Sequence, residues 1–265
     1  MTLPCYVNGI GVLGPGFANW PEAAAVLTGE NAYQAAPAAL PMPAILAAAE
    51  RRRTGRVVKL ALAVALEATS QAGADPAQLA SVFSSSGGDG HNCHEICQAL
   101  ATAGREISPT RFANSVHNAA AGYWSIGTGA VAESNVLCAF DASFSAGLLE
   151  ALTQVVVDRE SVLLVAYDTE YPQPLHAKRP LPDAFGIALL LAAEKNERSL
   201  ARLDAAMTTN DFDRLEDPAL EALRSAIPAA RCMPLLRRLA LRQPGLVTLE
   251  YLDVSRVEVR IEPCV

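Results

Sequence analysis

Short apolar segments of strand length alternate along this chain with longer segments whose apolar residues recur at helical spacing. This alternation constrains the fold most, because successive strands joined by helices pack side by side in one sheet. The pattern predicts strands at residues 5–13, 79–84, 135–140, 161–167 and 185–193. It predicts helices at about residues 21–28, 56–71, 90–103, 115–128 and 143–157. We therefore expect an α/β fold with a mainly parallel sheet and helices on both faces.

Two segments are apolar enough to lie inside the fold. Phe185–Ala193 has no polar alternation, which is typical of a strand covered on both faces. Arg56–Gln71 is apolar most of the way round, which predicts a buried helix. A chain of 265 residues can bury about three quarters of its unfolded surface. Both segments are therefore expected in the core.

The C-terminal part of the chain carries a different pattern. Helical spacing recurs at 219–226 and 234–241, and period-two alternation follows at 246–252 and 256–262. The alternation predicts a β-hairpin. No repeat and no linker is visible in the sequence, so we expect a single domain over residues 1–265.

Composition and charge exclude several classes of protein. Hydrophobic residues make up 51% of the chain and charged residues 18%, which excludes a disordered chain. The net charge of −7 argues against a nucleic-acid partner, since such proteins carry a basic surface. Neither a secretory signal nor a run of about 18 uncharged apolar residues is visible, so we expect a cytoplasmic protein without a membrane span. Its six cysteines are then expected to be reduced.

Two segments combine polar side chains with small neighbours. At 138–147, CAFDASFSAG, a predicted strand runs directly into a helix, so a side chain there feels the positive end of the helix dipole. Many folds place a nucleophile at such a junction, because the dipole stabilises its anion. At 108–124, SPTRFANSVHNAAAGYW, a loop leads into an alanine-rich helix. Its small residues allow close packing, and its polar residues need partners if they are buried.

These segments and their order resemble the N-terminal half of β-ketoacyl synthases. The matching stretches are YVNGIGVLGPG, ISPTRFANSVHNAAAGYWSIGTG, AFDASFSAGLLEAL and PDAFGIALLLAAE. The resemblance covers about residues 5–195 and implies a truncated thiolase-like fold, with residues 196–265 as divergent helices and a hairpin. The second stretch resembles a half-length branch of the family, the chain-length-factor-like proteins associated with aryl polyene pigment clusters.

The chain departs from the family at the catalytic residues. Aligned with condensing synthases, the position of the nucleophilic cysteine holds Phe144, or Ser145 if one gap is allowed. Cys138 comes six residues before Phe144, where we expect it to point into the sheet. The second half of a synthase supplies two histidines, or a histidine and an asparagine, whereas the last histidine here is His176. The resemblance therefore implies a chain that does not condense substrates on its own.

The resemblance implies instead a chain-length factor in fatty acid or polyketide-type biosynthesis. Such a chain forms a heterodimer with an active β-ketoacyl synthase and shapes its acyl or polyene tunnel, and an acyl carrier protein would bind through that partner. In this family the segment that matches residues 108–124 lies at the dimer contact. The resemblance implies that the side chains reaching the partner or its tunnel are Thr110, Arg111, Phe112, Ser115, His117 and Asn118.

Other interpretations of these residues remain open. Ser145 could be the nucleophile of an acyltransferase or thioesterase, although no base that would activate it is identifiable. The interpretation we favour is that Ser143 or Ser145 caps the helix, since serine is among the best N-caps. A third interpretation is a homodimeric acyl-binding protein.

A metal site is also conceivable from one cluster, His91, Cys93, His94 and Cys97. Zinc sites usually take paired ligands from two segments, and no second cluster is visible. We expect no metal and no cofactor. Of two arginine-rich clusters, the one at 51–59 is expected to be a solvated face, and the role of the one at 231–242 is left open.

Overall fold

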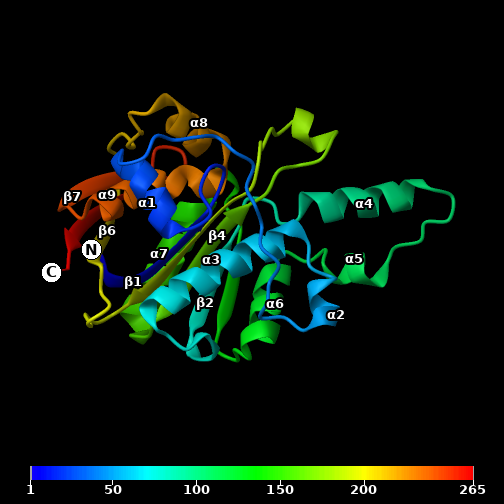
Figure 1. Ribbon diagram of the computed structural model, residues 1–265, viewed down its shortest axis with the longest axis horizontal. Helices are drawn as coiled ribbons and strands as arrows, with labels where there is room; N and C mark the ends of the chain where they lie inside the picture. The colour runs from blue at the N-terminus through cyan, green and yellow to red at the C-terminus, as the bar shows by residue number, and fades with distance from the viewer. Residues whose placement is uncertain (1, 265) are drawn as a thin grey trace.

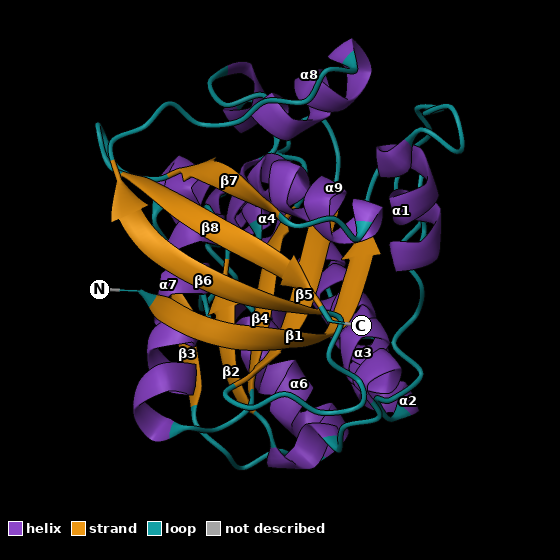
Figure 2. Ribbon diagram, turned by 90° about the vertical axis from the view of Figure 1, so that its left-hand side faces the viewer, coloured by secondary structure: helices purple, strands orange, loops and turns teal. Residues whose placement is uncertain are grey.

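Eight strands form one sheet in the order β3-β2-β4-β5-β1-β6-β8-β7 (Figure 1, Figure 2). This arrangement is that of a computed structural model, which describes residues 2–264. The strands are β1 (Leu3–Leu13), β2 (Ala80–Ser84), β3 (Ser134–Leu137), β4 (Val162–Asp168), β5 (Phe185–Ala192), β6 (Ala201–Thr208), β7 (Gly245–Glu250) and β8 (Arg256–Pro263). The helices are α1 (Trp20–Thr28), α2 (Ala48–Arg51), α3 (Arg56–Ala72), α4 (Gly90–Ala101), α5 (Pro109–Ala113), α6 (Ala119–Thr128), α7 (Ser143–Asp158), α8 (Pro218–Ala226) and α9 (Met233–Leu241).

The prediction of a mainly parallel sheet was wrong. Among the described strands only the β2–β3 and β2–β4 pairs are parallel, and the other neighbours are antiparallel. A parallel pair needs a long crossover connection, usually a helix. The connection from β4 to β5 holds only a short 3₁₀ turn at Leu175–Ala177, so β5 returns beside β4 in the opposite direction. The sheet is therefore mixed rather than mainly parallel.

A strand that the sequence analysis missed, β6, joins the C-terminal segment to the rest of the sheet. It pairs with β1 on one side and with β8 on the other. Its side chains alternate, with Ala201, Leu203 and Ala205 buried, so the signal was present in the sequence. The predicted hairpin is confirmed as β7 and β8, which extend the same sheet beyond β6.

Helices cover both faces of the sheet, as predicted. One face packs against α3, with α6 beside it, and the other packs against α7, with α1 and α9 nearby (Figure 2). Strand β4 shows the division, because Leu163 and Val165 belong to the core on the α3 side whereas Leu164 and Ala166 belong to the core on the α7 side. Every residue of β5 is buried, so the prediction of a strand covered on both faces is confirmed.

Helix α3 lies so close to β1 that only glycine fits between them. A Cβ atom on Gly11 would come within 2.0 Å of the carbonyl oxygen of Val64. Beyond the part of β1 that pairs with β6, two of its backbone N–H groups donate to the side chains of Gln71 and Glu67, at 2.7 and 2.9 Å. The helix therefore takes the place of a neighbouring strand at this point.

Two predicted boundaries need correction. The helix expected at 115–128 begins only at Ala119, as α6, and a separate short helix, α5, precedes it. Between them the Ser115 hydroxyl donates to Phe112 O at 2.8 Å, a local hydrogen bond that competes with helix formation. The strand expected at 135–140 ends at Leu137, because the chain turns sharply after it.

One helical stretch, Phe140–Asp158, is long and apolar enough to cross a membrane by length and composition alone. Half of it is buried inside the fold, where α7 packs against β1, β2 and β4. Such burial is typical of the core helix of a globular protein.

Candidate functional site

The junction between β3 and α7 is a sharp turn centred on Phe140. The backbone of Phe140 has a φ of +53°, a left-handed conformation that bulky residues rarely adopt. The Ser143 hydroxyl holds the turn, since it accepts a hydrogen bond from Ala139 N at 3.0 Å and donates one to Phe140 O at 2.7 Å. We call residues 138–142 the elbow.

Phe144 and Ser145, the predicted nucleophile positions, lie in the first turn of α7, after the elbow. Phe144 is buried in the core. The Ser145 hydroxyl is also buried and donates to the carbonyl of Glu250 at 2.6 Å. A backbone carbonyl cannot take up the proton, so this contact provides no general base. The capping prediction was wrong, because the N-cap of α7 is Ala142 and no side chain caps it.

Asp141, the residue after Phe140, is held by two arginines from distant parts of the chain. Its carboxylate pairs with Arg179 at 2.8 Å and with Arg231 at 3.1 Å. Arg179 also stacks on Phe140, with its guanidinium carbon 3.6 Å from the ring centroid. Arg231 also forms an ion pair with Glu250 at 3.3 Å. This arginine belongs to the cluster at 231–242, for which the sequence indicates no single role. The elbow is thus tied by ion pairs to the loop after β4 and to the C-terminal segment.

Cys138 does not point into the sheet as predicted. It is exposed, because β3 ends at Leu137 and the alternation of the strand stops there, and its thiol donates to Ser86 O at 3.2 Å. Cys5 and Cys232 are buried, and burial raises the pKa of both thiols, which keeps them protonated. The elbow therefore presents the Cys138 thiol, the Phe140 ring and the paired Asp141 carboxylate.

A buried carboxylate, Asp168, ties the end of β4 to its neighbours. One of its oxygens accepts hydrogen bonds from the amide and hydroxyl of Ser86, at 2.9 and 2.6 Å, and the other accepts from Ala229 N at 2.9 Å. Burial raises the pKa of Asp168 to about 6, although these hydrogen bonds and the charge of Arg179 act in the opposite direction. Since both oxygens are occupied by the chain itself, Asp168 has a structural role.

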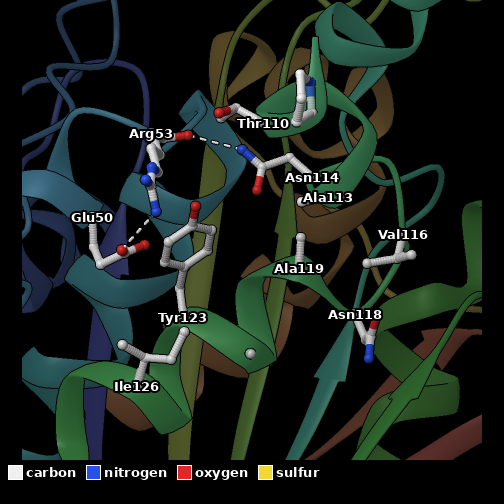
Figure 3. Close-up of a pocket in the computed structure, with 12 residues that line it drawn as sticks. Glu50, Arg53, Thr110, Ala113, Asn114, Val116, Asn118, Ala119, Tyr123 and Ile126 are labelled. Carbon is white, nitrogen blue, oxygen red and sulfur yellow. Dashed lines mark hydrogen bonds and ion pairs between the residues drawn. The ribbon is translucent and has the colours of Figure 1, made fainter. Parts of the chain in front are cut away.

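The second predicted segment forms an exposed surface from α5 and α6, with α2 beside them. Figure 3 shows the pocket of about 470 Å³ that lies between these helices. On one side Glu50 pairs with Arg53 at 2.9 Å, and Asn114 donates to Arg53 O at 2.8 Å (Figure 3). Tyr123 and Ile126 of α6 line another part of the wall. The pocket is thus mostly apolar, with one polar side.

Of the predicted partner residues, Thr110 and Asn118 line this pocket. Tyr123 and Ile126 were not among the predicted residues, although their spacing places them on one face of α6 and could have indicated them. No local pattern in the sequence indicates that Glu50 lines this pocket, because more than fifty residues separate α2 from α5.

The other predicted partner residues lie outside the pocket. Arg111 pairs with Glu95 of α4 at 3.2 Å. The Phe112 side chain is 68% exposed, and Ser115 donates to its carbonyl at 2.8 Å. His117 is half-buried. The structure therefore spreads the predicted residues over one surface rather than gathering them in one cavity.

Large apolar side chains are exposed along this surface and on to the edge of the sheet: Phe112, Val116, Ile126, Val131 and Phe140. Strand β3 forms this edge, and within residues 2–264 no other strand pairs with its outer side. We call α5, α6, β3 and the elbow together the partner face. Exposed apolar surface beside an unpaired strand indicates a contact with another polypeptide.

The cluster of His91, Cys93, His94 and Cys97 lies on α4, which extends away from the sheet (Figure 1). In the part of the chain that the structure describes, no three His, Cys, Asp or Glu side chains come together as a metal site would require. The arginine-rich cluster at 51–59 contains ion pairs with Glu50, Glu170 and Asp183.

The model of the β-ketoacyl synthase N-terminal domain matches residues 18–235 of this chain. None of the curated proteins compared with it is a match.

Several solved structures share the fold. One is a ketosynthase in complex with its chain length factor from Xenorhabdus doucetiae, with 23% identity, a TM-score of 0.74 and coverage of 97% of this chain and 99% of that chain. The ishigamide ketosynthase/chain length factor has 14% identity, a TM-score of 0.75 and coverage of 99% and 100%. A type II polyketide synthase acyl-carrier protein in complex with its ketosynthase has 10% identity, a TM-score of 0.76 and full coverage of both chains. The fold is therefore thiolase-like, as predicted.

Proposed function

The chain belongs to the β-ketoacyl synthase family, and from this membership we propose that it is a non-condensing chain-length factor. In this role it forms a heterodimer with an active ketosynthase and shapes the tunnel that receives the growing acyl or polyene chain. Residues 1–265 act as one ketosynthase-like domain in the cytoplasm, and an acyl carrier protein is engaged through the partner.

The observation that carries the proposal is the composition of the elbow. A condensing enzyme needs a nucleophile at this junction, with groups close by that stabilise the thioester oxygen. Here the turn holds Phe140 and Asp141, and two arginines already pair with Asp141. The hydroxyl of Ser145 and the thiol of Cys138 each donate to a backbone carbonyl, which cannot act as a base. Among residues 2–264, the elbow and the first turn of α7 thus offer no activated group that could carry an acyl intermediate.

The partner face supports the proposal that the chain forms a heterodimer. It combines the unpaired edge of β3 with a pocket and exposed apolar side chains on α5 and α6. Lasting subunit contacts are larger and more apolar than transient ones. The opposite edge of the sheet is partly covered by the chain itself, since Thr248 N on β7 donates to the Asp213 carboxylate at 2.7 Å and Asp213 N donates to Thr248 O at 2.9 Å. The open edge is therefore the one available for a partner.

The related structures support a ketosynthase as the proposed partner. Two of them hold a ketosynthase together with a chain length factor, although their low identity to this chain establishes only the fold. The same pairing is the natural hypothesis for a chain with this fold and this elbow.

Co-expression with a neighbouring ketosynthase, followed by native mass spectrometry, tests the proposal. We expect a complex of one copy of each chain. After incubation with an acyl thioester, label should appear only on the ketosynthase. A label on this chain would contradict the proposal.

Two alternatives give different results in the same experiment. An acyltransferase or thioesterase would carry the label at Ser145. A homodimeric acyl-binding protein would form a symmetric dimer without the ketosynthase and would retain fatty acyl ligands.

A further inference from the structure

Phe140 combines two unfavourable features, a left-handed backbone conformation and an exposed aromatic side chain. It adopts a φ of +53°, where a bulky side chain is strained and glycine is not. The residue is 60% exposed, although burying a phenylalanine side chain is favourable. Neither feature helps the isolated chain to fold. Strained and exposed residues of this kind are concentrated at functional sites.

The ring is nevertheless held in a fixed position. Arg179 lies over it at 3.6 Å from the ring centroid, and the same arginine pairs with Asp141. Arg231 binds the other oxygen of Asp141, and Ser143 donates to the carbonyl of Phe140. The backbone and the ring are therefore fixed before any partner arrives. An aromatic side chain fixed in this way loses little entropy on binding.

The surroundings of Phe140 indicate the kind of molecule that it contacts. Strand β3 ends at Leu137, three residues earlier, and the N–H and C=O groups on its outer side face away from the sheet. Such a row of groups is a ready template for pairing with a strand of another polypeptide. At the other end of β3, Val131 is 96% exposed. Apolar side chains thus flank both ends of the open edge.

We infer that Phe140 is an anchor residue for the partner ketosynthase, whose surface offers an apolar pocket for the ring beside a strand that pairs with β3. This inference rests on the proposed function and adds to it the residue that contributes most to the affinity. Buried aromatic anchors, often next to arginine, dominate many protein interfaces. Phe140 is therefore a binding residue and has no part in chemistry.

The test is Phe140→Gly, which removes the ring and suits the left-handed backbone. The melting temperature of the isolated chain should stay the same or rise, because the backbone strain is relieved. The Kd for the ketosynthase should rise at least tenfold, as expected for an interface anchor. Phe140→Asn provides a second variant, since asparagine also tolerates a positive φ. Leu246→Ala is the control, because Leu246 is exposed on β7, at the opposite edge of the sheet and at the end of β7 away from Glu250.

Four results would overturn the inference. Unchanged affinity of both Phe140 variants would place the anchor elsewhere. A clear drop in the melting temperature of both isolated variants would make the ring part of the chain's own fold. A changed product length at unchanged affinity would mean that the ring meets the acyl chain and not the partner. Failure of the wild-type chain to bind the ketosynthase would refute the proposed function as well, and is distinguished by the wild-type measurement alone.

Discussion

Gly122 of α6 offers two substitutions: alanine should stabilise the isolated chain, and tryptophan should weaken its complex with a ketosynthase. A Cβ atom on Gly122 would meet nothing within 4 Å, and the residue lines the pocket of the partner face. Glycine in a helix costs about 1 kcal/mol relative to alanine. Gly122→Ala should therefore raise the melting temperature by about 2–4 °C in a chain of this size.

Gly122→Trp uses the same open space to test the interface. In the isolated chain the indole projects into solvent, so we expect no loss of stability. In the complex it must enter a packed contact, where overfilling costs about 1–3 kcal/mol or more. We therefore expect the Kd for the ketosynthase to rise about tenfold to a hundredfold.

Isothermal titration calorimetry with the purified ketosynthase measures this effect, and thermal unfolding of the free chain checks that the variant is folded. Ala222→Trp is a matched control, because Ala222 is exposed on α8, outside the partner face. Wild-type affinity of Gly122→Trp would refute the assignment of α6 to the interface. A loss of affinity in Ala222→Trp as well would show that the bulky residue acts non-specifically.

Three further predictions concern the chain alone. Gly11→Ala should destabilise it by about 3 kcal/mol in urea unfolding, because the new methyl group would meet the Val64 carbonyl, and a change below about 1 kcal/mol would refute that close packing. Ser145→Ala should cost about 1–2 kcal/mol through the lost hydrogen bond to Glu250 and leave acyl labelling of the chain at zero; label on the wild-type chain that this substitution abolishes would contradict us. Burial raises the pKa of Asp168 from 3.8 to about 6, so the native state binds the Asp168 proton more tightly than the unfolded state does. Protonation of Asp168 therefore stabilises the fold at low pH, and this contribution to the unfolding free energy is lost as the pH rises through about 6. Asp168→Asn should flatten the fall in unfolding free energy between about pH 4 and 7, and an unchanged slope would show that Asp168 does not titrate in this range.

The periodic elements were predictable from the sequence because burial imposes their spacing. Helix α3 begins at Arg56 and ends before Gly73, as expected for an apolar helix with a glycine at its C-terminus. Strand β5 was predictable because all its residues are apolar and buried, and the C-terminal hairpin was predictable because its apolar residues alternate. These elements depend mainly on which side chains face the core.

Strand direction and order were not predictable in this way, because they depend on contacts between distant segments. Strand β1 lies between β5 and β6, although about 170–200 residues separate it from them in the sequence. Nothing in the local pattern of β1 specifies these neighbours. The alternation of apolar residues in β6 is short. Without knowledge of the neighbouring strands β1 and β8, it does not distinguish a strand from a loop.

The candidate site was predictable only in part, for the same reason. The sequence indicated the segment with Thr110 and Asn118, but not the contribution of α2 to their pocket. It indicated the junction before α7, but not that the turn falls on Phe140. That turn depends on Arg179 and Arg231, which reach the elbow from elements far along the chain.

In the function proposed above, this chain supports condensation by another subunit and does not perform it. The most direct measurement is the rate of malonyl thioester condensation by the chain alone, by the ketosynthase with the chain, and by the ketosynthase with Gly122→Trp. We predict no product from the chain alone, full activity from the wild-type pair, and a loss of activity with Gly122→Trp that a higher chain concentration restores. Condensation by the chain alone would contradict the account.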